Sequence, residues 1–99
     1  MEPDPQWRLV RFIDHLDRWA AAEDPDQDTR LAVASWIMAR HDNPYANVRR
    51  DPSAPNLWFG RVGGTRRPDG TIVTCSYFIF ETDQVVRCHA IGRLFLPLP

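Results

Sequence analysis

The alternation of apolar and polar residues is clearest from residue 71 to residue 94, where it predicts two antiparallel strands joined by a tight turn. A turn at residues 82–83 would place Ser76 opposite His89. One face of this hairpin is almost wholly apolar and comprises Val73, Cys75, Tyr77, Ile79, Val86, Cys88 and Ala90. The other face is mixed and comprises Thr74, Ser76, Phe78, Phe80, Arg87, His89 and Arg93. The apolar face requires a covering layer, and the mixed face is where a ligand could bind.

A first helix is predicted ahead of the hairpin. Asp4-Pro5 is a helix start signal, and apolar residues then recur at three- and four-residue spacing to about Ala22. This stripe comprises Leu9, Phe12, Ile13, Leu16, Trp19 and Ala20. An alternative interpretation makes residues 6–12 a short strand that precedes a shorter helix.

A second helix is predicted to begin at Asp24-Pro25 and to end before Asn43-Pro44, because a residue that precedes proline is disfavoured in the helical conformation. Its stripe comprises Leu31, Ala34, Trp36, Ile37, Met38 and His41. The short connection between the helices predicts an antiparallel pair that covers the apolar face of the sheet.

A further strand is predicted at residues 57–62, where Trp58 and Val62 fall on one face and Leu57, Phe59 and Arg61 on the other. The residues on either side of this strand lack such a pattern. The preceding segment is polar and interrupted by prolines, which indicates a loop, and the following segment is a glycine-rich turn.

The order of these elements predicts an α+β fold, in which two N-terminal helices pack on one face of a three- to four-stranded antiparallel sheet. We expect a single domain over residues 1–99, because this length supports one core. Its parts would be a helical layer at 5–42, a loop at 43–56, an antiparallel sheet at 57–94 and an irregular, proline-containing tail at 95–99.

The composition of the chain bears on its cellular compartment and on the state of its cysteines. The chain has no apolar run long enough to span a membrane, and its acidic start lacks the apolar segment of a signal peptide, so we expect a cytoplasmic protein. Cys75 and Cys88 lie on the same face of neighbouring predicted strands, where a disulfide is conceivable. In a reducing compartment, small core residues are the favoured interpretation.

Charge is distributed unevenly along the chain. Residues 1–28 hold eight acidic residues against three arginines, whereas residues 29–99 hold nine arginines against five acidic residues. All 12 cationic residues are arginines, which bind phosphate through a planar fork and stack on bases. The positive charge therefore belongs to the part of the chain that contains the predicted sheet.

The mixed face of the sheet carries the candidate chemistry. If Trp58 packs under the helices, Arg61 joins Arg87, His89 and Arg93 on the open face. Histidine can transfer a proton near neutral pH, and arginines can bind phosphate and stabilise developing negative charge. Surface residues without a role are the alternative for all four.

Further candidates surround this face. The aromatic residues that could stack bases or contact a partner protein are Phe59, Phe78 and Phe80. The loop cations that could contact RNA phosphates are Arg49, Arg50, Arg66 and Arg67. We expect no metal site, because the cysteines lack metal-binding spacing and adjacent Cys88 and His89 point to opposite faces.

The order of elements over residues 9–94 resembles the RelE/ParE superfamily of toxin–antitoxin toxins, above all its HigB-like branch. Leu57, Trp58 and Arg61 match that branch's Leu-Trp/Tyr-Glu-Leu-Arg strand. Residues 88–93, with the sequence C-H-A-I-G-R, are similar to its Leu-His-Gly-Phe-x-Lys-Lys pattern.

The resemblance implies a compact ribonuclease-like fold whose open sheet face cuts ribosome-bound messenger RNA without a metal or other cofactor. It implies that Arg61, Arg87 and Arg93 bind phosphate and that His89 acts as general acid or base. It also implies a cognate antitoxin protein that wraps this face. Two alternatives remain open: a non-catalytic protein-interaction module with a toxin-like fold, and a ParE-like gyrase inhibitor.

Overall fold

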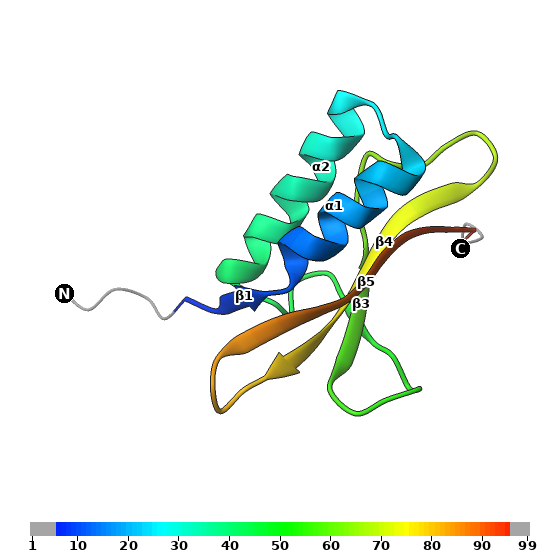
Figure 1. Ribbon diagram of the computed structural model, residues 1–99. Coiled ribbons are helices and arrows are strands. Elements are labelled where there is room, and N and C mark those ends of the chain that lie inside the picture. Colours follow the sequence, from blue (N-terminus) through cyan, green and yellow to red (C-terminus); the bar gives the residue numbers. More distant parts are fainter. Residues whose placement is uncertain (1–5, 96–99) are drawn as a thin grey trace.

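The computed structural model describes residues 6–95. Its elements, in chain order, are β1 (Arg8–Val10), α1 (Phe12–Glu23), α2 (Gln27–Met38), a 3₁₀ turn (Ala39–His41), β2 (Arg49–Arg50), β3 (Leu57–Arg61), β4 (Thr71–Phe80) and β5 (Val85–Phe95). Helices α1 and α2 lie side by side over one face of a twisted sheet, and the opposite face is open (Figure 1). The α+β class and the two-helix layer are as predicted.

The sheet is five-stranded and mixed, with strand order β1-β5-β4-β3-β2, so the prediction of three to four antiparallel strands is wrong. β1 pairs in parallel with β5, and β2 pairs antiparallel with β3. These two outer strands contain only three and two residues, which is too short for a detectable alternation. β2 lies within the segment that was predicted to be a loop.

Both helices begin later than predicted. The chain enters α1 through Arg11, whose left-handed backbone (φ 69°) separates the helix from β1, so the strand-then-helix alternative is correct. The predicted Asp4-Pro5 start lies outside the described residues. Helix α2 is capped by Asp26, whose side chain accepts a hydrogen bond from the Thr29 amide at 2.9 Å. Asp26, not Asp24, therefore marks its start.

The core lies between the helices and the sheet. Its buried members are Phe12, Trp19, Val33, Ile37, Val62, Val73, Cys75, Tyr77, Ile79, Val86 and Cys88. Three large apolar residues of the predicted helix stripes are exposed, since Ile13, Leu31 and Met38 are 74%, 60% and 58% exposed. Helix α2 turns Val33 inward instead, so its predicted stripe is partly wrong.

A β-bulge interrupts the pairing of β4 with β5. Tyr77 pairs with Cys88, as predicted, but Ser76 pairs with Ala90, and His89 is the extra residue. Beyond the bulge, Arg93 pairs with the core residue Val73. The inserted residue therefore reverses which residues of the second half of β5 face the helices.

Candidate functional site

The open face of the sheet is hollowed by a groove of about 390 Å³. It is lined by Asp51, Phe59, Thr74, Ser76, Ala90, Ile91, Gly92 and Leu94. β4 supplies the centre of the floor, β5 supplies one side, and Phe59 of β3 with Asp51, which follows β2, supplies the other. This open-face groove is mainly apolar and contains a single carboxylate.

At one end of the groove, the bulge directs His89 onto the open face. The ring of His89 meets the ring of Phe78 edge to face, with centroids 5.4 Å apart. His89 is exposed, so its imidazole is accessible to a ligand. The predicted open-face position of His89 is correct, although its predicted pairing with Ser76 is not.

Arg87 lies beside His89 on the same strand. Its guanidinium lies over the rings of Phe78 and Phe80, at 5.5 and 5.3 Å from their centroids. The two rings are stacked on each other at 6.4 Å. This packing places a cation over two aromatic rings, an arrangement suited to phosphate binding or to stacking on nucleobases.

A second cationic position lies across the sheet. Arg61 pairs with Thr74 and Arg49 pairs with Phe59, so both arginines belong to the open face at the β2–β3 edge. Four residues along β4 and two strand spacings separate Arg61 from Arg87, which is about 16 Å between Cα atoms. Arg61 therefore shares the open face with Arg87, as predicted, but lies at the opposite side of the sheet from it.

Arg93 lies on the helix side of the sheet, so its predicted place on the open face is wrong. It donates to the Thr65 carbonyl at 2.7 Å. Burial lowers the pKa of Arg93, and the charge of Arg67 lowers it further. Since the bulge reverses the alternation of β5, the side chain faces away from His89.

The remaining loop cations also lie away from the groove. Arg66 and Arg67 line a polar hollow together with Arg93 and Asp26, near the start of α2. Arg50 pairs with Trp58, which packs against the helix-side core, so its strand position is on the face opposite to that of Arg49. Of the four predicted loop contacts to RNA, the structure brings only Arg49 to the open face.

Asp51 was missed at the sequence level because it lies in a segment that was predicted to be a loop. Its carboxylate accepts a hydrogen bond from the Ser53 amide at 2.9 Å, which is a short Asp-x-Ser turn. Hydrogen bonds from Ser53 lower the pKa of Asp51, and the charge of His89 lowers it slightly further. The Asp-Pro-Ser sequence is a turn signal that could have identified a fixed carboxylate at this position.

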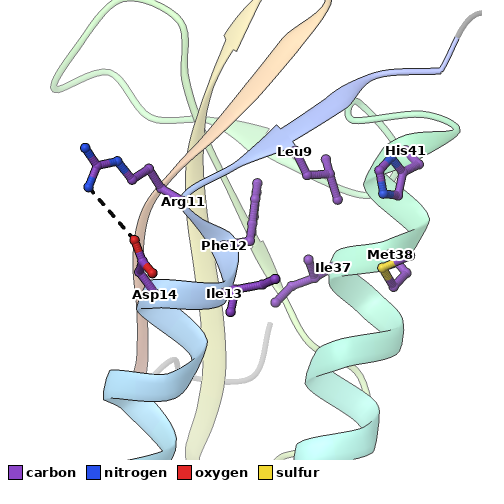
Figure 2. Close-up of a pocket in the computed structure, with 8 residues that line it drawn as sticks. All are labelled: Leu9, Arg11, Phe12, Ile13, Asp14, Ile37, Met38 and His41. Carbon is purple, nitrogen blue, oxygen red and sulfur yellow. Dashed lines mark ion pairs between the residues drawn. The ribbon is translucent and has the colours of Figure 1, made fainter.

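A separate hollow of about 270 Å³ opens between the start of α1 and the end of α2 (Figure 2). Its lining is Leu9, Arg11, Phe12, Ile13, Asp14, Ile37, Met38 and His41. The guanidinium of Arg11 and the carboxylate of Asp14 form an ion pair of 3.9 Å on its rim. The imidazole of His41 lies 2.8 Å from the Trp7 carbonyl. This hollow offers apolar surface for contact with a protein.

The two cysteines are free and buried, in line with the favoured interpretation that they are core residues. A hydrogen bond with Cys88 and burial both raise the pKa of Cys75, so its thiol is protonated at neutral pH.

Within residues 6–95, no three His, Cys, Asp or Glu side chains are grouped so that they could hold a metal ion. No helix in that same range is long and apolar enough to cross a membrane.

Among solved structures, the chain is similar to E. coli toxin RelE, in a variant with two arginine-to-alanine substitutions in the free state. The TM-score is 0.60 at 13% sequence identity, over 88% of this chain and 82% of that one. No protein-family model matches the sequence, and no curated protein matches it. The protein therefore has a RelE-like fold, with two helices on a mixed sheet.

Proposed function

We propose that this protein is the toxin of a toxin–antitoxin pair, of the HigB-like branch, and that it cuts messenger RNA on the ribosome with its open sheet face. The RelE-like fold supports the class. The observation that carries the proposal is the cluster formed by His89, Arg87 and Phe78 at one end of an open groove. It combines a proton-transfer group, a phosphate-binding cation and an aromatic ring.

In the proposed reaction, the 2′-hydroxyl oxygen attacks the adjacent phosphorus and the bond to the 5′ oxygen breaks. His89 accepts the hydroxyl proton as the new bond forms, and its protonated ring can return a proton to the leaving oxygen. Arg87 donates hydrogen bonds to the phosphate oxygens, on which negative charge develops. Arg49 and Arg61 bind phosphates further along the same RNA strand.

A cognate antitoxin is the proposed protein partner. Exposed apolar side chains support such a contact, namely Ile13 and Met38 at the helix ends and Leu94 and Phe95 on β5. An antitoxin that covers the open face would block access to His89. We place the reaction in the cytoplasm, where ribosomes translate.

Expression in bacteria tests the catalytic proposal. The wild type should arrest growth and produce new 5′ ends within translated messenger RNA, whereas an Arg87→Ala, His89→Ala double variant should do neither. Arg30→Ala is the matched control, because Arg30 is an exposed arginine of the helical layer and should leave the arrest intact. If the wild type causes no arrest, or if the double variant remains as toxic, the proposal is wrong.

A non-catalytic interaction module is the second candidate. The exposed fractions of Leu94 and Phe95, 55% and 66%, favour it, because these side chains add apolar surface to both faces of the end of β5. Under this alternative, expression leaves messenger RNA intact. An adjacent small reading frame for a helix-turn-helix protein would favour the toxin, whereas DNA-damage signalling with intact messenger RNA would favour a gyrase inhibitor.

A further inference from the structure

The hydroxyl groups in the floor of the open-face groove are engaged in hydrogen bonds with the backbone. The Thr74 hydroxyl donates to the Gly92 carbonyl at 3.2 Å, and the Ser76 hydroxyl donates to the Ala90 carbonyl at 3.5 Å. An ideal Cβ atom built at Gly92 meets no heavy atom within 4 Å. The floor therefore has open space above Gly92 and hydroxyl groups that already donate to the backbone, which leaves room for an apolar ring.

Asp51 gives this groove its polarity. Hydrogen bonds from Ser53 keep the carboxylate ionised at neutral pH, so Asp51 can only accept hydrogen bonds. A carboxylate accepts up to about four hydrogen bonds, which leaves capacity for a ligand that carries donors. On a face that binds phosphates, an uncompensated carboxylate weakens binding, so its presence favours a ligand that donates to it.

A ligand that suits this groove needs a planar apolar ring and hydrogen-bond donors that face Asp51, and few ligands combine the two. Among the RNA bases, guanine presents two neighbouring donors, N1–H and the N2 amino group, on its Watson–Crick edge. Adenine and cytosine place one amino group beside an acceptor, and uracil places its single N–H between two carbonyls. A carboxylate therefore pairs in bidentate fashion with guanine alone. Unpaired bases are commonly recognised by such edge contacts together with stacking on aromatic rings.

We propose that the open-face groove holds an unpaired guanine base, whose N1–H and N2 amino groups donate to the Asp51 carboxylate while its ring packs against Phe59. Phe59 lines the same groove and is half-buried. The inference rests on the proposed function, because it requires RNA to reach the open face. It makes Asp51 the residue that selects the nucleotide near the site of cutting.

Titration of the isotope-labelled protein with free nucleotides tests the inference without ribosomes or catalysis. Guanosine 5′-monophosphate should shift the amide resonances of Asp51, Phe59 and Gly92 and bind about tenfold more tightly than adenosine 5′-monophosphate. Inosine 5′-monophosphate, which lacks the amino group, should bind between the two. Equal affinity for guanosine and adenosine nucleotides, or shifts confined to other residues, would overturn the inference.

Two pairs of variants sharpen the result. Asp51→Asn keeps the size but loses one acceptor oxygen, so it should abolish the guanine preference, whereas Asp28→Asn on the helical layer should retain it. Gly92→Leu should fill the groove and prevent nucleotide binding, whereas Gly63→Leu should not, although both glycines have open space at Cβ. Unchanged binding by Gly92→Leu would also overturn the inference.

The outcome can be separated from that of the proposed function. A protein that arrests growth but binds both nucleotides equally would retain the toxin activity and lose the guanine site. A protein that binds guanosine nucleotides selectively but causes no arrest would retain the site and lose the proposed nuclease.

Discussion

At the scale of single residues, the buried guanidinium of Arg40 stands out, because it is only 4% exposed and has no carboxylate partner among residues 6–95. It donates to the carbonyls of Trp36 and Ala46 at 3.2 and 2.9 Å and to the Tyr77 hydroxyl at 3.3 Å. It also lies 4.0 Å from the centroid of the Trp36 ring. Arg40 therefore fastens the loop after α2 to the core through neutral acceptors.

We predict that Arg40→Met lowers the free energy of unfolding by about 2–4 kcal/mol, because a side chain of similar length leaves buried acceptors without donors. Urea denaturation measures this change. The exposed Arg30→Met should alter stability by no more than about 0.5 kcal/mol. Equal stability of the two variants would contradict the structural role of Arg40.

The positions of some single residues could be predicted from the sequence, and those of others could not. The open-face positions of Arg87 and His89 follow from alternation counted from the hairpin turn, which fixes the register near it. That of Arg61 follows from the packing of Trp58 against the helix-side core. Arg93 was misplaced because an inserted residue leaves no mark in the hydrophobic pattern. Arg40 was not identified, since its partners come from the backbone and from distant residues that no local spacing reveals.

At the scale of elements, the approach of β3 to α2 depends on Gly60. An ideal Cβ atom at this position would lie 2.6 Å from Cζ2 of Trp36 and 2.9 Å from Cγ1 of Val48. Such distances are too short for real contacts, so a side chain would force the strand and the helix apart. Glycine is therefore required here for packing.

We predict that Gly60→Ala destabilises the fold by about 1–3 kcal/mol through overpacking against the Trp36 ring. Gly92→Ala is the matched control on β5 of the same sheet, where the added methyl group meets nothing and should cause little loss of stability. Thermal denaturation followed by circular dichroism compares the two. A Gly60→Ala protein as stable as the wild type would show that the helix can move aside freely.

Elements were predictable in proportion to their length. The hairpin strands and both helices are long enough to repeat their pattern, so their existence was correctly predicted. β1 and β2 depend on partners supplied by β5 and β3, and this information is not local to their own residues. The position of Asp51 in the candidate site could not be predicted for the same reason, since Asp51 reaches the groove only because β2 pairs with β3.

At the scale of the whole molecule, the net charge of −1 conceals a sheet face that carries Arg49, Arg61 and Arg87. Binding of single-stranded RNA should therefore depend on only about three phosphate contacts. We predict that the logarithm of the binding constant falls with the logarithm of salt concentration with a slope of about −2. Fluorescence anisotropy with a labelled oligouridine measures this slope.

Removal of one cation gives the corresponding control. Arg87→Ala should make the slope shallower by about 0.7, whereas Arg30→Ala should leave it unchanged. A slope near zero for the wild type would mean that these arginines do not contact phosphates.

The order of elements predicted the fold class at this scale, but not the parallel pairing that makes the sheet mixed.

The bulge at His89 has a consequence for how this protein can change over time. Residue 89 has no counterpart across the ladder, and its side chain is exposed. The side chain at residue 89 therefore contributes nothing to the packing of the core, but it does contribute to the surface beside the groove. We therefore expect that a substitution at residue 89 changes the chemical character of this surface and leaves the fold intact.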